Sequence, residues 1–208
     1  IDDNSYTLQS DYREVTLPWI DYQGRPYKWQ VPSETGCRAC HRVNAVLGPT
    51  VGQLNRQVAY PSWSANQLVA LNGIGLFEQS FSGSPQTLEV LPDPSDETLS
   101  LQDRAKSILH ADCGHCHLPG GFVPPELPID FRWSTPLADM AACDVDLMYV
   151  NLGSVGSKVI DPGNPENSNA LQRMMLRTID QMPPMGTTRV DTESVKIVTD
   201  WISSLDSC

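Results

Sequence analysis

The chain is poor in lysine and has no run of basic residues. Its 208 residues include 14 Lys and Arg against 25 Asp and Glu, which gives a net charge of −11. Nucleic-acid binding depends on clustered cations that neutralise phosphates, so this balance argues against a phosphate-backbone binder. No apolar stretch approaches the ~20 residues that a membrane-spanning helix needs, and we therefore expect no membrane span.

Cysteine and histidine are also few, but their positions form a pattern. The sequence C-x-x-C-H occurs twice, at Cys37 to His41 and at Cys113 to His117. At this chain's own frequencies of the two residues, chance predicts about 0.003 such matches. The pattern is the attachment site of c-type haem, so the sequence predicts two covalently bound haem c groups.

Each residue of this pattern has a chemical role. Two thiols add to the two vinyl groups of one haem, and the adjacent histidine supplies the proximal nitrogen to iron. The predicted thioether residues are Cys37, Cys40, Cys113 and Cys116, and the predicted proximal ligands are His41 and His117. Because this attachment is made outside the cytoplasm, we expect a periplasmic or secreted bacterial protein. No signal peptide is visible at Ile1, so we expect any export signal to have been removed or to precede this sequence.

Two other uses of the cysteine pairs remain open. Cys37, Cys40, Cys113 and Cys116 could together bind zinc, although zinc does not require a histidine after each pair. The segment Cys113-Gly114-His115-Cys116 also matches a thiol–disulfide active site, but that interpretation leaves the first motif unexplained.

The remaining pattern predicts a mainly α, loop-rich fold of short helices around the haems. Residues 1–95 are expected to be an N-terminal haem-binding segment with a small β-hairpin around Gly24, and residues 79–99 a linker. Residues 96–208 are expected to form a second domain. Short helices are expected near 50–58 and 64–72, and amphipathic helices over about 100–112, 168–177 and 192–205.

A methionine lies between the last two of these helices, in Gln181-Met182-Pro183-Pro184-Met185-Gly186. A thioether in the sixth position raises the potential of a haem, and the prolines would stiffen the loop that presents it. We therefore predict Met182 as the distal ligand of the second haem.

Residues 100–208 resemble a class I cytochrome c in Ala105, Ile108-Leu109, Cys113-x-x-Cys116-His117, Met182-Pro183-Pro184 and a final helix with Trp201. The whole chain resembles a di-haem module of secreted and periplasmic bacterial proteins. The shared segments are Pro32-Ser33, Val46-Leu47-Gly48, Gln53 to Arg56, Asn66-Gln67-Leu68, Gly75-Leu76-Phe77, Leu109-His110, Pro162-Gly163 and Met182 to Pro184. Members are often fused to sugar-dehydrogenase or carbohydrate-binding domains. The resemblance implies electron transfer linked to carbohydrate oxidation or to copper polysaccharide monooxygenases.

Two cysteines remain once the haem thiols are assigned, Cys143 and Cys208. In an oxidising compartment such a pair favours a disulfide. Closing this span would stabilise the fold by roughly 4 kcal/mol in the chain-entropy model.

The distal ligand of the first haem is the open question. The candidates are His110, His115, Met140, Met148, Met174, Met175 and Met185, of which we favour His110. With a ligand in place the protein would be an electron carrier. A vacant position would instead favour a di-haem peroxidase, but no clear distal acid–base pair is visible. The acidic chain predicts a redox partner with a basic or neutral docking patch, and we expect a monomer.

Overall fold

The computed structural model describes residues 11–20, 24–42, 47–79, 83–124, 126–147 and 157–208. The chain divides into two compact units, one of residues 1–45 with 94–208 and one of residues 46–93. The prediction placed a domain boundary after residue 95, whereas the second unit ends at residue 93. The first 45 residues, which carry the first C-x-x-C-H motif, belong to the same unit as the second motif.

The expectation of a mainly α fold was wrong. The structure has 34% helix and 13% strand, with two small antiparallel sheets, so it is not clearly mainly α. The physical reason is local: prolines and turns keep most helices short, and a second hairpin forms where the sequence pattern predicted helices.

The first hairpin was correctly expected around Gly24. Strand β1 (Arg13–Ile20) pairs antiparallel with β2 (Pro26–Val31). Two long-range hydrogen bonds attach β2 to the C-terminal part of the chain. The Thr188 hydroxyl donates to the Lys28 carbonyl over 3.0 Å, and the Arg189 guanidinium donates to the Pro26 carbonyl over 2.9 Å. These bonds help to explain why the N-terminal segment groups with the second motif.

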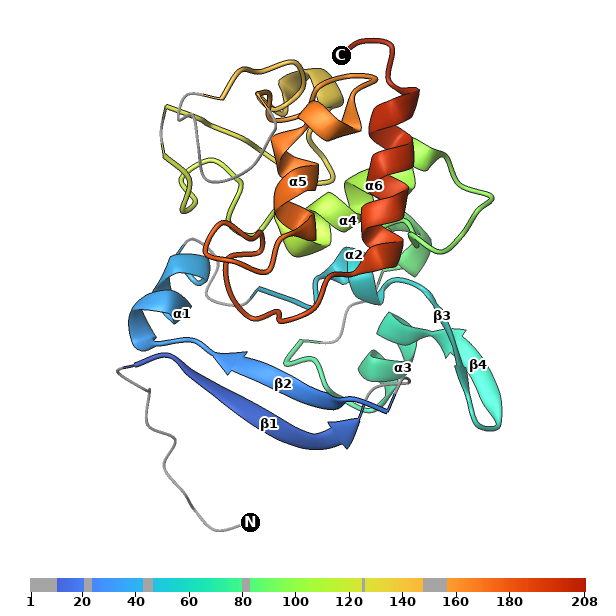
Figure 1. The fold of residues 1–208 in the computed structure, drawn as a ribbon. Helices are drawn as coiled ribbons and strands as arrows, with labels where there is room; N and C mark the ends of the chain where they lie inside the picture. The colour runs from blue at the N-terminus through green and yellow to red at the C-terminus, as the bar shows by residue number, and fades with distance from the viewer. Residues whose placement is uncertain (1–10, 21–23, 43–46, 80–82, 125, 148–156) are drawn as a thin grey trace. The chain divides into compact units, whose positions relative to one another are not determined.

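The core of this unit is built on three helices, α4 (Leu101–Asp112), α5 (Asn169–Met175) and α6 (Thr192–Ser204). Helix α6 packs against α4 and α5 (Figure 1). Helix α4 begins where predicted, because the Ser100 side chain accepts a hydrogen bond from the Asp103 backbone over 3.0 Å. The buried apolar cluster includes Ala105, Ile108, Leu109, Ile129, Phe131, Met140, Leu171, Met174, Val198, Trp201 and Ile202. The apolar face predicted for α4 is therefore part of the core.

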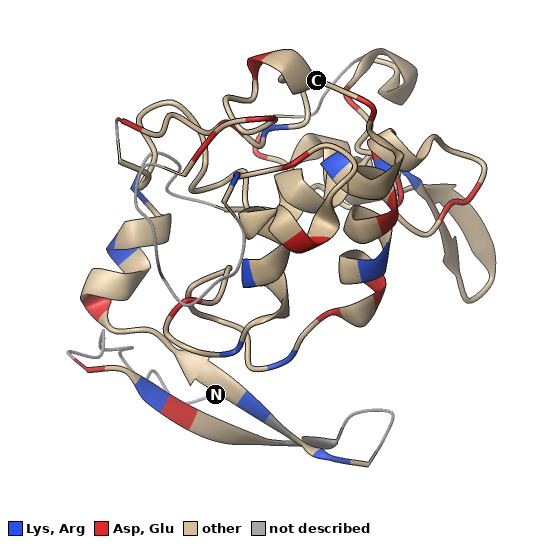
Figure 2. Cartoon of the chain, turned by 45° about the horizontal axis from the view of Figure 1, so that its top comes forward, with Lys and Arg blue, Asp and Glu red and all other residues tan. Residues whose placement is uncertain are grey.

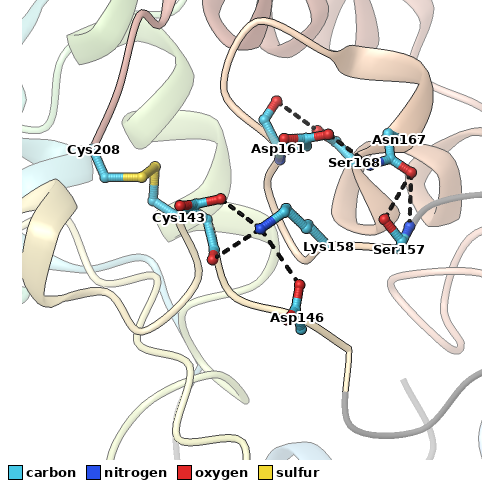
Figure 3. Close-up of polar contacts among 9 residues, drawn as sticks. Cys143, Asp146, Ser157, Lys158, Asp161, Asn167, Ser168 and Cys208 are labelled. Carbon is cyan, nitrogen blue, oxygen red and sulfur yellow. Dashed lines mark hydrogen bonds and ion pairs between the residues drawn. A yellow bond between two sulfur atoms is a disulfide. The ribbon is translucent and has the colours of Figure 1, made fainter.

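A disulfide joins Cys143 to the chain end at Cys208, as the sequence predicted (Figure 3). Beside it, the Lys158 ammonium lies 2.6 Å from an Asp144 carboxylate oxygen and 3.4 Å from one of Asp146. Buried Ser168 precedes α5, and its hydroxyl accepts a hydrogen bond from the Asp161 backbone over 2.8 Å. These contacts hold the irregular chain before α5 in one arrangement.

The second unit contains α2 (Val51–Leu54), β3 (Gln57–Tyr60), β4 (Trp63–Asn66), α3 (Gln67–Gly73) and the 3-10 turn η1 (Pro85–Thr87). The helices predicted over 50–58 and 64–72 were therefore only partly correct. Strands β3 and β4 pair across Pro61-Ser62, and the Tyr60 and Trp63 rings stack with centroids 4.3 Å apart. The pattern of β-forming residues around a proline turn favoured this hairpin, and the helical expectation overlooked it.

The segment 79–99 is not a free linker over its described residues. The amide of buried Asn55 donates to the carbonyls of Pro85, Leu88 and Glu89 over 2.8 to 3.2 Å. Arg56 donates to the Leu91 carbonyl over 3.2 Å. Hydrogen bonds from polar side chains thus hold in place a Pro- and Ser-rich segment whose sequence has no hydrophobic periodicity.

Acidic and basic residues are interspersed over the described chain (Figure 2). On α6, for example, Lys196 pairs with Asp200, and on the first hairpin Lys28 lies 2.7 Å from Glu14. None of the helices that the structure describes is long and apolar enough to cross a membrane.

Candidate haem and thiol site

The second C-x-x-C-H motif continues directly from the end of α4. Cys113 is the C-cap of this helix, and its carbonyl accepts a hydrogen bond from the His117 backbone over 2.9 Å. The Phe131 backbone donates to the His117 carbonyl over 3.0 Å, and the two rings are 5.3 Å apart between centroids. The core helix and a core aromatic residue therefore fix the position of the motif.

A cavity of about 770 Å³ opens beside this motif. Its volume lies within the range of about 300–1,000 Å³ typical of pockets for ligands and cofactors. Four residues of the motif line it: Cys113, His115, Cys116 and His117. Its apolar walls include Leu109, Phe122, Leu127, Ile129, Phe131, Leu147, Val159 and Met174. The motif thus contributes two thiols and two imidazoles to a cavity with apolar walls.

Met182, the predicted distal ligand, lines the same cavity. Buried Gln181 stabilises its loop, because the side-chain amide donates to the carbonyls of Pro183 and Thr187 over 3.0 and 3.1 Å. The two residues predicted to bind one iron, His117 and Met182, therefore share one cavity although they are far apart in sequence.

His117 is a half-buried imidazole that is suited to metal binding. Its Nδ1 atom has no hydrogen-bond partner among the described residues. Burial, with smaller contributions from the nearby charges of His115 and Arg173, lowers the pKa of His117 to about 4. The ring is therefore neutral at pH 7, as a metal ligand must be.

Two ionisable residues in the cavity wall, Asp112 and Arg173, were not predicted from the sequence. Burial raises the pKa of the Asp112 carboxyl, and the neighbouring Asp191 adds to this effect. Burial lowers the pKa of Arg173, whose Nε donates to Asn169 over 3.0 Å. Nothing in the local sequence singles out Arg173, which lies on the amphipathic helix α5. A cation in an apolar cavity suits a ligand that carries negative charge.

The first motif lies on α1 (Glu34–Cys40), and Ser33 is the N-cap of this helix. The Ser33 hydroxyl accepts a hydrogen bond from the Gly36 backbone over 3.2 Å. Cys40 lines the cavity, whereas Cys37 and His41 do not. His41 is the exposed C-cap of α1, and its backbone donates to the Cys37 carbonyl over 2.9 Å. Of the three predicted haem-binding residues of the first motif, the structure therefore brings only Cys40 to the cavity, together with the neighbouring Ala39.

Helix α1 also contacts the loop that carries Met182. The Met185 sulfur lies 3.1 Å from the position that a β-carbon on Gly36 would take. A larger residue at Gly36 would therefore press on this loop.

Cys40 and Cys116, one from each motif, face each other next to His115. Their ligand atoms all lie within 4.8 Å of one another. Hydrogen bonds from Cys116 and then from His115 lower the pKa of Cys40 to about 5, against the opposing effect of burial. The bond to Cys40 raises the pKa of Cys116. Burial and the nearby Asp112 charge raise the pKa of Cys113 to about 12.

The structure separates the candidates for the distal ligand of the first haem. His115, Met174 and Met185 line the cavity. Met140 is fully buried in the core, Met175 is exposed, and Met148 lies outside the described residues. His110 does not line the cavity, and its Nδ1 accepts a hydrogen bond from the Trp133 backbone over 3.2 Å. Iron ligation by His110 stays a prediction.

The residues at the second motif fit a haem c. They supply two thiols, a neutral imidazole with an unpartnered buried nitrogen, a thioether, a cation and apolar walls around one cavity. At the first motif the donor set is present, but most of it lies outside this cavity. No protein family, curated protein or solved structure matches the chain.

Proposed function

We propose that the chain is a di-haem c-type cytochrome that carries electrons between periplasmic or extracellular redox partners. The observation that carries this proposal is the shared cavity of Cys113, Cys116, His117 and Met182, which are the donors that one covalently attached, six-coordinate haem requires.

Each of these residues would have one task. Cys113 and Cys116 would hold the porphyrin through thioethers, and His117 and Met182 would be the two protein ligands of the iron. The bound haem would supply a reversible one-electron couple. The apolar walls exclude water, and the hydrogen bonds of Gln181 hold the Met182 loop in place. Fixed ligands in a dry site change little between oxidation states, and this property favours fast electron transfer.

For the first haem, Cys37 and Cys40 would form the thioethers and His41 the proximal bond. His110 is the proposed distal ligand. If both irons have two protein ligands, the protein is a carrier; if the first has a vacant position, peroxide chemistry becomes available there.

The net charge of the chain indicates which kind of partner surface it would bind. With a net charge of −11, and acidic residues spread among fewer basic ones (Figure 2), the protein would dock on a basic or neutral patch of a redox protein. The resemblance suggests carbohydrate oxidation, or the supply of electrons to copper polysaccharide monooxygenases. We propose that it acts as a monomer, because electron-transfer encounters use small interfaces.

The experiment is to purify the chain from a periplasm that attaches haem c, and then to record absorption spectra, electrochemical waves and peroxide turnover. An electron carrier will show low-spin spectra and two reversible one-electron waves. A high-spin band together with peroxide turnover far above that of free haem would contradict the proposal.

A further inference from the structure

One cysteine from each C-x-x-C-H motif contributes to a three-residue cluster that neither motif forms alone. The Sγ atoms of Cys40 and Cys116 and a ring nitrogen of His115 lie within 4.8 Å of one another, and all three residues are half-buried. Cys40 is the last residue of α1, whereas His115 and Cys116 follow α4. The fold therefore brings these three donors together from distant parts of the sequence.

Two thiolates and an imidazole form a donor set that zinc prefers. Zn²⁺ binds sulfur at about 2.3 Å and nitrogen at about 2.0–2.1 Å in tetrahedral geometry, so its ligand atoms lie about 3.5–3.8 Å apart. Small side-chain rotations would bring the three atoms to that spacing. Soft sulfur donors select such a cation over Mg²⁺ or Ca²⁺, which prefer oxygen. Three protein ligands leave a fourth position for water.

The cluster differs from the four-cysteine zinc site that the sequence alone allowed. Cys37 and Cys113, the first cysteines of the two motifs, are not part of it. Cys113 is the C-cap of α4, and Cys37 lies one turn earlier on α1 than Cys40. These two residues are therefore matched controls, since each has the same chemistry and the same motif as a proposed ligand.

We propose that the haem-free chain binds one soft divalent cation of the zinc class through Cys40, His115 and Cys116. Binding releases the thiol protons to solvent and makes no covalent change in the chain. The same two sulfurs cannot then add to haem vinyl groups, so the cation blocks attachment at both motifs. This last consequence rests on the proposed function, whereas the metal site itself does not.

The test uses the full chain, produced without haem attachment and kept reduced. Zn²⁺ binding is measured by equilibrium dialysis, and Co²⁺ serves as the spectroscopic probe of thiolate ligation. Cys40→Ser, Cys116→Ser and His115→Ala are compared with Cys37→Ser and Cys113→Ser. A Cys143→Ser/Cys208→Ser variant controls for the reduced disulfide, and circular dichroism checks that each variant folds.

We expect one equivalent of Zn²⁺, a tetrahedral Co²⁺ spectrum with sulfur charge-transfer bands, and at least about tenfold weaker binding in the three cluster variants only. Equal losses in Cys37→Ser and Cys113→Ser would assign the metal to a four-cysteine site and overturn the proposal. Absence of metal binding, or a Cys40–Cys116 disulfide in place of bound metal, would also overturn it. Haem incorporation is measured separately on periplasmic protein, so its failure would leave the metal result intact.

Discussion

The backbone N–H of Met182 donates to the carbonyl oxygen of Arg173 over 3.0 Å. This bond ties the methionine loop to α5, and both residues line the cavity beside the second motif. The fold thereby places a thioether and a cation next to the same proposed haem.

Replacing Met182 by alanine tests whether it is the proposed iron ligand. Because a thioether raises the haem potential, we expect the potential of one haem to fall by on the order of 100 mV, within the range of about 0.8 V that axial ligands span. The sulfur-to-iron charge-transfer band should disappear from the absorption spectrum. Met175→Ala is the control, since Met175 is exposed and does not line the cavity. Unchanged potentials of both haems in Met182→Ala would exclude Met182 as a ligand.

Replacing Arg173 by glutamine will remove the cation in the cavity wall. Oxidised haem carries one more positive charge than reduced haem, so a nearby cation favours reduction. We expect the variant's potential to be about 60 mV lower, which is a tenfold change for a one-electron couple. Potentiometric titration measures this, and Arg25→Gln removes the same charge from the hairpin turn as a control. A shift of equal size in Arg25→Gln would mean that only net charge matters.

The Asp130 carboxylate accepts hydrogen bonds from the Arg132 backbone and guanidinium over 2.6 to 3.1 Å. Burial would raise the pKa of Asp130, but these bonds outweigh it and lower the pKa below its usual value. This contribution to stability is complete above the unfolded pKa of about 3.9 and is lost as pH falls through the lower folded pKa.

We therefore expect Asp130→Asn to reduce the free energy of unfolding by about 1–3 kcal/mol at pH 7, with a smaller cost at low pH. Urea unfolding across this pH range measures the effect. Asp200→Asn breaks an exposed pair on α6 and should cost no more than about 0.5 kcal/mol. A cost for Asp130→Asn that does not depend on pH would contradict the assignment.

The Cys143–Cys208 disulfide closes a loop with a sequence separation of 65 residues. In the chain-entropy model it stabilises the fold by roughly 4 kcal/mol. Cys143→Ser/Cys208→Ser should lose about that much in urea unfolding, and alkylation with mass spectrometry should find no thiol at either position in the oxidised wild type. Two alkylated thiols in protein isolated without reductant would show that the pair is not bonded.

Local patterns predicted several parts of the fold because short-range chemistry determines them. Ser100 caps α4, the turn at Gly24 precedes β2, and the apolar face of α6 packs in the core. The hairpin at Tyr60 and Trp63 was not predicted, because over such short segments the sequence pattern of a strand pair is hard to tell from that of a short helix. The grouping of residues 1–45 with the C-terminal part depends on long-range bonds such as that of Thr188 to Lys28, which no local pattern reveals.

In the candidate site too, some features could be predicted from the sequence and others could not. Spacing and residue type indicated the motif at Cys113 and the Met182 loop from the sequence alone, and the structure places residues of both at one cavity. Neither the position of Arg173 in the cavity wall nor the contact of Cys40 with Cys116 could be predicted from the sequence, because both depend on how distant segments fold against each other.

Counting the covalently bound haems on each chain tests the central claim most directly. Intact-mass spectrometry of protein matured in a haem-attaching periplasm should give the polypeptide plus two haems, and Cys113→Ser/Cys116→Ser should retain one. A wild-type mass equal to the bare polypeptide after such maturation would contradict the account.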